Sequence, residues 1–318
     1  MTVKILIIKL GYSETLDTEI GRVPSLGDVL RTTPVLWALK EKYPDSHITW
    51  LVSENAEQLL HGNKFIDRIL MWDAFVPFQL MREKFDVLIN LEKIPGVAAL
   101  SDMIDGWTRY GFRFDSVTGR YHAYESGLSF IDYIEKKKKT NNTKDFWQKV
   151  LIEMLGVEWK GQEYIIGYKP KTEEMHDVGL NYEVGSKWPT KAMPMERWKE
   201  LEKKLQHAGY TVSWQRGLKD LYEYMDWIHS CKLIISTDSL GIHLAFTFKK
   251  NVIGIFGSTD SQEIYLYDKG KVIHSHQACT YMPCYYSKCI TGLNCMNEIN
   301  IDKVIETSRE MLRKEKAL

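Results

Sequence analysis

The sequence predicts an α/β protein of two domains, each built around a parallel sheet. Its 318 residues are about the length of two ordinary domains. Hydrophobic residues make up 44% of the chain and charged residues 26%, which is typical of a folded globular protein and too apolar for a disordered one. Short apolar runs alternate with helical patterns in both halves, and that alternation predicts parallel strands covered by helices.

The first domain begins with a βαβ unit. The segment Val3–Ile8 predicts a buried strand, the helical spacing of apolar residues over 28–43 predicts a helix, and residues 47–52 predict a second strand. The same alternation predicts helices over 56–60 and 75–84, with strands over 66–72 and 85–91. Residues 113–144 lose this pattern and include a run of four lysines, which we interpret as a solvated loop. We place the end of the first domain at residue 159.

The second domain repeats the alternation after a helix over 146–155 and a linker over 156–170. Helices are predicted over 196–208, 218–231 and 241–248, and strands over 211–215, 233–236 and 252–256. We assign residues 160–300 to this domain, including a cysteine-rich loop over 279–295, and predict a separate final helix within 301–318. Two such domains in series usually bind a ligand in a cleft at the carboxyl ends of their strands.

Charge and hydropathy exclude several classes of protein. The 42 basic and 42 acidic side chains give a net charge of zero, which argues against a nucleic-acid-binding protein with a globally basic surface. No stretch approaches the roughly 18 apolar residues of a membrane-spanning helix. The apolar run at the N-terminus is only four residues long, too short for a signal peptide. We therefore expect a cytoplasmic protein without a transmembrane segment.

Several common catalytic motifs are absent from the sequence. No Gly-x-Gly-x-x-Gly follows the first strand, and no Gly-x-x-x-x-Gly-Lys-Ser/Thr occurs anywhere, which disfavours dinucleotide-dependent dehydrogenases and P-loop enzymes. A His-Glu-x-x-His zinc site and a Gly-x-Ser-x-Gly nucleophile elbow are also missing. A different chemistry must use the predicted cleft.

The first candidate site residue is Asp28, which follows Gly27 where the first helix begins. A carboxylate at the carboxyl end of a strand faces the predicted cleft, where it can accept a proton from a hydroxyl nucleophile. Aspartate is also a common helix N-cap, and that structural interpretation remains open for Asp28 from this feature alone.

Two further segments have the residues that suit a phosphate-bearing ligand. The loop over 185–198 carries Ser186 and Lys191 between a glycine and two prolines, although lysines in such loops are often simply solvated. The strand over 233–236 leads through Asp238, Ser239 and Gly241 into a helix whose free N–H groups suit an anion. Structural alternatives are that Asp238 caps the helix and that His243 is a core histidine.

Together these segments resemble glycosyltransferase family 9, the ADP-heptose:lipopolysaccharide heptosyltransferases and their relatives. The resemblance depends on motifs that occur in the family's order, namely Gly27-Asp28 with Thr33-Pro34, Ser186 to Pro194, Asp238-Ser239 with His243, and Phe256-Gly257-Ser258-Thr259. It implies the GT-B fold, with two Rossmann-like domains facing across a cleft. It also implies that the acceptor binds the first domain and the sugar nucleotide the second, and that the C-terminal helix packs back on the N-terminal domain.

The resemblance also implies roles for individual residues. Asp28 is the implied general base, Ser186 and Lys191 contact the diphosphate, and the remaining donor-site residues are Asp238, Ser239, Gly241 and His243. The sequence departs from the family where Leu240 stands in place of a usual glycine. The loop over 10–25 is longer than usual, and we expect it to contact the acceptor.

Four cysteines lie within one short segment near the C-terminus: Cys279, Cys284, Cys289 and Cys295. Four thiolates supply the tetrahedral sulfur set that zinc or iron prefers, but the Cys-x-x-Cys pair of many such sites is missing. Similar segments are familiar in family 9, and in the bacterial autotransporter heptosyltransferases a comparable element binds iron. Structural zinc or iron is one interpretation, and reduced thiols packing the loop is the other. Cys231 is predicted to be a buried small hydrophobe.

The predicted activity is inverting transfer of a heptose from ADP-heptose to a hydroxyl of a lipopolysaccharide-type glycan or of a protein, with no cofactor required for catalysis. Three alternatives remain open: a homologue that binds a nucleotide sugar or glycan without transferring it, a scaffold that assembles through the cysteine loop, and a transferase for another nucleoside-diphosphate sugar. Homo-oligomerisation and peripheral contact with the inner membrane are both compatible with the sequence, and neither is specified by it.

Overall fold

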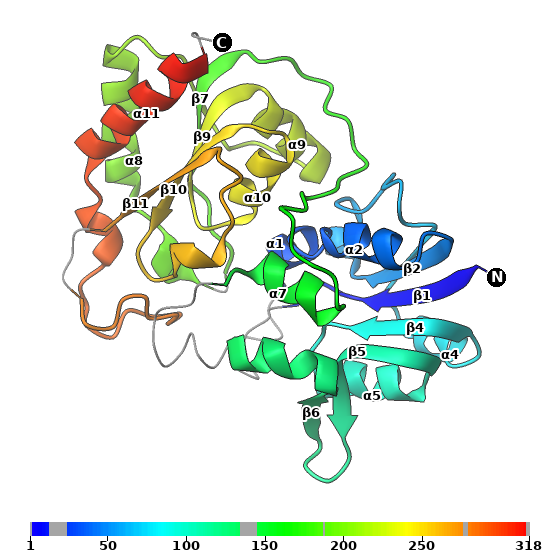
Figure 1. Cartoon of the computed structure of the whole chain (residues 1–318). Helices are drawn as coiled ribbons and strands as arrows, with labels where there is room; N and C mark the ends of the chain where they lie inside the picture. The colour runs from blue at the N-terminus through cyan, green and yellow to red at the C-terminus, as the bar shows by residue number, and fades with distance from the viewer. Residues whose placement is uncertain (1, 13–23, 134–144, 187, 276–278, 316–318) are drawn as a thin grey trace. The chain divides into compact units, whose positions relative to one another are not determined.

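The strands of the chain form two separate sheets, one in each of two units. A computed structural model describes residues 2–12, 24–133, 145–186, 188–275 and 279–315. The N-terminal unit is Met1–Tyr168 and the C-terminal unit is Lys169–Leu318 (Figure 1). The lysine run over 136–139 and most of the loop over 10–25 lie outside the described residues, so the predictions made for them stay predictions.

The N-terminal sheet has six strands in the order β3-β2-β1-β4-β5-β6. Neighbouring strands from β3 to β5 run parallel, and β6 pairs antiparallel with β5. The strands are β1 (Val3–Ile8), β2 (Ser46–Val52), β3 (Arg68–Met71), β4 (Lys84–Asn90), β5 (Asp105–Asp115) and β6 (Arg120–Ala123). The predicted strands from β1 to β4 are therefore present within two residues at each end.

Helices cover the N-terminal sheet on both faces. Leu6 and Ile8 of β1 pack with α4 and α5 in one apolar cluster, while Ile5 and Ile7, which point to the opposite face, are also fully buried. Burial of both faces explains why β1 reads as a continuous apolar run rather than an alternating one. The helices of this unit are α1 (Leu26–Leu30), α2 (Val35–Lys42), α3 (Glu54–Glu57), α4 (Val76–Leu80), α5 (Pro95–Met103) and α7 (Trp147–Met154), with the 3-10 turn η2 (Glu125–Gly127).

The helix predicted over 28–43 is broken into α1 and α2. Pro34 stands between them and has no N–H to donate to the carbonyl of Leu30. Both the N–H and the hydroxyl of Thr33 donate to that carbonyl instead, at 3.0 and 2.7 Å. The break ends α1 after five residues, so the segment carrying Asp28 is a short helix of its own.

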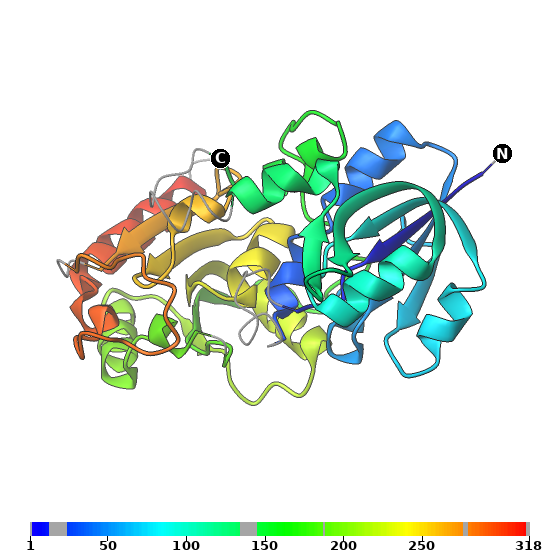
Figure 2. The same ribbon diagram turned by 90° about the horizontal axis from the view of Figure 1, so that it is seen from below.

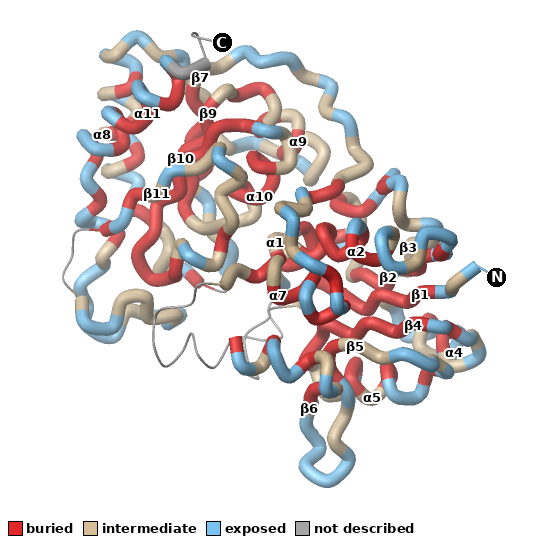
Figure 3. The backbone as a smooth tube through the Cα atoms, in the orientation of Figure 1, coloured by how far each residue is buried: buried red, intermediate tan, exposed pale blue. Residues whose placement is uncertain are grey.

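The C-terminal sheet has five parallel strands in the order β11-β10-β9-β7-β8. The strands are β7 (His176–Asn181), β8 (Val212–Trp214), β9 (Cys231–Thr237), β10 (Asn251–Phe256) and β11 (Gly270–His274). Figure 3 shows β9 and β10 buried along their length, as expected for central strands of a doubly covered sheet.

Helices α8 and α11 lie side by side on one face of this sheet, and α9 and α10 cover the other (Figures 1 and 2). The apolar cluster under α8 and α11 contains Leu233 and Ile235 of β9. The helices are α8 (Met195–His207), α9 (Leu221–His229), α10 (Leu240–Thr247) and α11 (Ile301–Glu315), with 3-10 turns η3 (Pro189–Lys191), η4 (Ser261–Glu263) and η5 (Cys295–Glu298). Within the described residues, no helix is both long and apolar enough to cross a membrane.

Two details of the predicted domain division differ from the structure. We placed the domain boundary after residue 159, yet the chain stays with the N-terminal unit to Tyr168 because Ile165 donates its N–H to Thr33 Oγ1 and accepts from Asn63 Nδ2. We expected the final helix to pack on the N-terminal domain. The apolar residues of α11 are instead buried with α8 and the strands of the C-terminal sheet.

The strand order of each sheet has one position where the chain reverses direction across the sheet. In the N-terminal unit it lies between β1 and β4, and in the C-terminal unit between β7 and β9. In open α/β sheets, ligands bind outside the carboxyl ends of the strands at such a position. The topology of each unit therefore predicts one ligand-binding site. The site lies near Asn90 in the first sheet and near Asn181 in the second.

Candidate functional site

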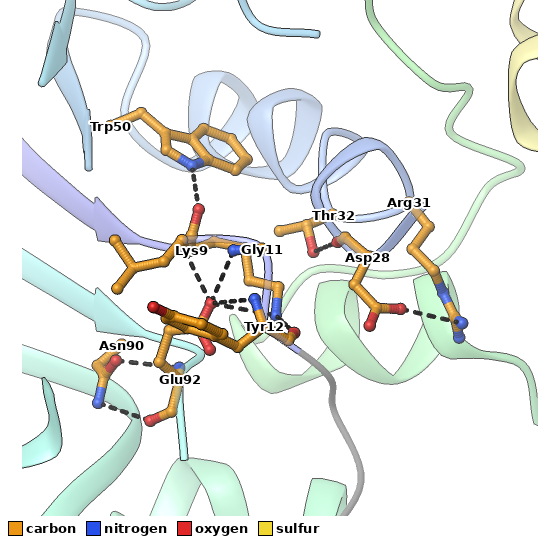
Figure 4. A network of polar contacts seen from close by, with 10 residues as sticks. Lys9, Gly11, Tyr12, Asp28, Arg31, Thr32, Trp50, Asn90 and Glu92 are labelled. Carbon is orange, nitrogen blue, oxygen red and sulfur yellow. Dashed lines mark hydrogen bonds and ion pairs between the residues drawn. The ribbon is translucent and has the colours of Figure 1, made fainter. Parts of the chain in front are cut away.

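The N-terminal switch position holds a buried ion pair. Lys9, directly after β1, is fully buried, and its Nζ lies 3.4 Å from Oε1 of Glu92, which follows β4 and is 1% exposed. The same carboxylate oxygen accepts the N–H groups of Leu10, Gly11 and Tyr12 at 2.7, 3.0 and 3.4 Å (Figure 4). Glu92 therefore fixes the chain where it leaves β1 towards the predicted acceptor loop.

Neighbouring groups hold both members of this pair. Asn90 accepts the N–H of Glu92 and donates to its carbonyl, at 3.0 and 3.2 Å, and Trp50 donates its indole N–H to the carbonyl of Lys9. Lys9 Nζ donates to the carbonyl of Tyr12 at 3.0 Å. The network thus links the ends of β1 and β4 and holds the side chains of Lys9 and Glu92 in one arrangement (Figure 4).

We expect Glu92→Gln to destabilise the N-terminal unit by about 3–5 kcal/mol, because removing one member of a buried pair leaves the other charge uncompensated. Urea denaturation measures the free energy of unfolding. Lys9→Met in the Glu92→Gln background should restore part of the loss, since it removes the remaining charge. Glu54→Gln, at an exposed position, is the control. A Glu92→Gln loss no larger than the Glu54→Gln loss would show that the pair does not hold this unit together.

Asp28 lies inside α1, three residues after the N-cap Ser25, so the N-cap interpretation of Asp28 is wrong. Its side chain is 5% exposed, and its Oδ1 lies 3.5 Å from Nη1 of Arg31 one turn later. The guanidinium of Arg31 stacks on the ring of Trp147 at 4.6 Å, which fixes its position. A guanidinium at this distance favours the ionised carboxylate. Figure 4 shows the carboxylate directed towards Arg31.

The C-terminal switch position holds an ion pair between two predicted donor-site residues. Lys191 Nζ lies 2.6 Å from Oδ2 of Asp238, and the Thr259 hydroxyl donates to the same oxygen at 2.8 Å. Burial favours the neutral form of a carboxyl, but the ammonium of Lys191 and the hydroxyl of Thr259 hold the pKa of Asp238 well below its usual range. Asp238 therefore stays ionised and holds Lys191 at the carboxyl end of β9.

An amide network positions the start of α10. Asn181, at the end of β7, donates to the hydroxyls of Ser236 and Ser239 at 2.7 and 2.8 Å and accepts from the hydroxyl of Tyr224 at 2.6 Å. Burial raises the pKa of Tyr224 well above its usual value, so its hydroxyl is protonated and donates. A Cβ on Gly241 would come within 2.5 Å of Asn181 Nδ2 and 2.6 Å of the Tyr224 hydroxyl. Glycine is therefore required there for close packing.

The structure brings together most of the predicted donor-site residues. The ion pair joins Lys191 to Asp238, and the amide network of Asn181 includes Ser239 and packs closely against Gly241. The buried His243 helps to lower the pKa of Asp238 by its charge. Ser186 is exposed in the preceding turn, and the hydrogen bonds described for these networks do not include it. Sequence reasoning did not single out Asn181, because the strand before it, β7, was not predicted.

The cysteine loop packs against this donor-site region. Cys284 and Tyr285 donate their N–H groups to the carbonyl of Ser258, and burial together with the other three loop thiols raises the pKa of Cys295. Among the described residues, however, no three histidine, cysteine or acidic side chains are arranged to hold a metal ion. The donor chemistry fits zinc or iron, whereas the described thiols do not form a closed site, so the metal remains a prediction. Cys231 is fully buried, as predicted.

Comparison with known proteins places this chain among heptosyltransferases. The model of glycosyltransferase family 9 (heptosyltransferase) matches residues 216–293. The lipopolysaccharide core heptosyltransferase OpsX of Haemophilus influenzae is 22% identical over 92% of this chain and 96% of its own. Lipooligosaccharide heptosyltransferase 2 of Campylobacter jejuni is 31% identical over 86 residues, which span 26% of each protein.

Solved structures agree with that placement. The ADP-heptose lipopolysaccharide heptosyltransferase II of Escherichia coli superimposes with a TM-score of 0.69 over 99% of this chain and all of its own, at 16% identity. The chain is similar to the heptosyltransferases of glycosyltransferase family 9. The iron-containing dodecameric glycosyltransferase TibC of enterotoxigenic E. coli has a TM-score of 0.59 at 14% identity, covering 98% of this chain and 78% of TibC.

These findings confirm the predicted resemblance to glycosyltransferase family 9 and the GT-B fold with its two Rossmann-like domains. The protein is a glycosyltransferase of the heptosyltransferase type. The match of the family model includes Asp238 to His243 and the turn after β10, whereas Asn181 and Lys191 of the C-terminal networks lie before the matched residues.

Proposed function

We propose that this family 9 glycosyltransferase transfers a heptose from ADP-heptose to a hydroxyl of a lipopolysaccharide-type glycan, with inversion at the anomeric carbon. The observation that carries the proposal is the Lys191–Asp238 ion pair at the C-terminal switch position, 2.6 Å long and supported by Thr259. It places a fixed ammonium beside the start of α10, where free N–H groups favour a diphosphate. The names of the E. coli and H. influenzae relatives support the choice of donor and acceptor.

The proposed reaction needs one base and one group that stabilises the leaving diphosphate. Asp28 accepts the proton of the acceptor hydroxyl as the oxygen forms its bond to the anomeric carbon of the heptose. The bond from that carbon to the diphosphate oxygen breaks, and its electron pair leaves with ADP. Lys191 and the N-terminus of α10 stabilise the negative charge that develops on the diphosphate.

The test is a turnover assay with purified protein, ADP-heptose and a lipopolysaccharide core that lacks heptose. We expect release of ADP in step with appearance of the heptosylated glycan, and a change of anomeric configuration in its NMR spectrum. Retained configuration would overturn the inverting mechanism. Turnover only of another nucleoside-diphosphate sugar, with release of the nucleoside diphosphate which that sugar carries, would overturn the choice of donor. Binding of ADP-heptose without either product would favour the non-catalytic alternative.

We also propose that the cysteine loop binds zinc or iron as a structural ion, held by Cys279, Cys284, Cys289 and Cys295. The sulfur donor set supports it, as does the similarity in fold to the iron-containing glycosyltransferase TibC. Elemental analysis of protein purified anaerobically with both metals supplied should find about one ion per chain. Cys284→Ser should lose most of it, while Cys231→Ala, outside the loop, should keep it. A wild-type protein without bound metal would overturn this proposal.

A further inference from the structure

One short stretch of the cysteine loop, Cys284 to Tyr286, contacts both segments that supply partners to Asp238. On one side, the hydroxyl of Thr190 donates to the carbonyl of Tyr286 at 2.7 Å, and Thr190 directly precedes Lys191. On the other side, the N–H groups of Cys284 and Tyr285 donate to the carbonyl of Ser258 at 3.0 and 2.9 Å. Ser258 directly precedes Thr259. The stretch therefore bridges the two chain segments that meet at Asp238.

Tyr285 makes the largest share of these contacts. Its hydroxyl accepts the N–H of Asp260 at 3.1 Å and donates to the carboxylate of Glu263. Its ring meets the ring of the buried Trp188 edge to face, with centroids 6.3 Å apart. One side chain thus touches the residue after Thr259 and the turn that carries Lys191.

The backbone of Tyr285 is in the left-handed region, with φ of 53°. For a residue with a large side chain this conformation is unfavourable and persists only where surrounding contacts enforce it. The N–H, the ring and the hydroxyl of Tyr285 each contact the donor-site region, and these contacts hold the backbone in the left-handed conformation. The conformation is an observation separate from the hydrogen bonds, and it indicates that the position of this side chain is specified by the fold.

We propose that Tyr285 is a positioning residue of the donor site: it braces Thr259 and Lys191 on the two sides of Asp238, so that the Lys191 ammonium is held in place for the diphosphate. The inference rests on the proposed function, because it takes the ion pair to be the diphosphate-binding group. It gives the cysteine loop a role that needs no metal, since the contacts run through Tyr285 and the backbone of its neighbours.

The first variant to test is Tyr285→Phe, which keeps the ring against Trp188 and removes only the hydroxyl. We expect the KM for ADP-heptose and the Kd for ADP to rise about tenfold, because the two hydrogen bonds that fix this side chain by its hydroxyl are lost. The KM for the acceptor should stay within about twofold. Tyr281→Phe, the matched control on a half-exposed tyrosine of the same loop, should leave all three constants unchanged.

The second test approaches the brace from its other side. Thr190→Val removes the hydroxyl that donates to Tyr286 and should raise the same donor constants, whereas Thr190→Ser keeps the hydroxyl and should restore them. If both side chains act through one brace, Tyr285→Phe with Thr190→Val should weaken ADP binding by less than the product of the two single effects.

Thermal unfolding separates positioning from general damage to the fold. A variant that only loses stability lowers the amount of active enzyme and therefore kcat, without changing the donor KM of the molecules that remain folded. Unchanged donor KM and ADP Kd in Tyr285→Phe would overturn the proposal, as would equal increases in donor and acceptor KM. Failure of the proposed function is distinguishable, because wild-type protein would then not turn over ADP-heptose at all.

Discussion

Replacing Asp28 by asparagine is expected to reduce the rate of sugar transfer by about 100-fold or more, which is the usual contribution of a general base. The carboxamide keeps the shape of the carboxylate but cannot accept the proton of the acceptor hydroxyl. The Kd for ADP should stay within about twofold, because the Lys191–Asp238 pair belongs to the C-terminal unit. Initial rates of ADP release and calorimetric binding of ADP measure the two quantities.

A folding check and one control variant make this result specific. Asp28→Asn removes the carboxylate beside the half-buried Arg31, so circular dichroism must first show that the variant is folded. Asp45→Asn, at an exposed aspartate of the same unit, should transfer sugar at the wild-type rate. A folded Asp28→Asn protein that keeps more than a third of the wild-type rate would show that another group removes the proton.

The central strands were predictable because burial on both faces leaves a direct mark on the sequence. Residues 5–8 and 252–256 carry no polar side chain, and the structure has buried strand residues at both. The strand β5 was missed because exposed and charged residues interrupt it, among them Trp107, which is 90% exposed. β7 was missed although it is central, since His176, Asp177 and Gly179 break its apolar pattern.

The candidate site was predictable only where a motif lies within one segment. Asp28, Lys191 and Asp238 were identified in that way, although the ion pair between the last two joins segments 47 residues apart along the sequence and was not foreseen. Lys9 and Glu92 were not identified at all. A charged residue directly after a strand usually reads as solvent-exposed, and only the pairing of β1 with β4 buries these two against each other.

Replacing Lys191 by methionine is expected to lower kcat by about 100-fold and to weaken ADP binding, because the residue supplies the charge that stabilises the leaving diphosphate. Methionine keeps most of the length of the side chain and removes the ammonium. Lys204→Met is the matched control, since Lys204 forms ion pairs with Glu200 and Asp302 on the surface, where such pairs contribute little. An effect of Lys191→Met no larger than that of Lys204→Met would remove Lys191 from the proposed donor site.

The pH dependence of this variant tests the role of Asp238 separately. In the wild type, burial raises the pKa of Asp238, but the charge of Lys191 outweighs burial and the net pKa is lowered. The stability that the ionised Asp238 contributes is therefore fully present above the ordinary carboxyl pKa and is lost only as the pH falls below it. Without the ammonium, burial raises the pKa of Asp238 with less opposition. As the pH falls, protonation then removes the buried negative charge that destabilises the variant. The difference in unfolding free energy between the two proteins should therefore be largest near pH 7 and shrink towards pH 4. A difference that stays constant over this range would mean that the Lys191 charge does not act on Asp238.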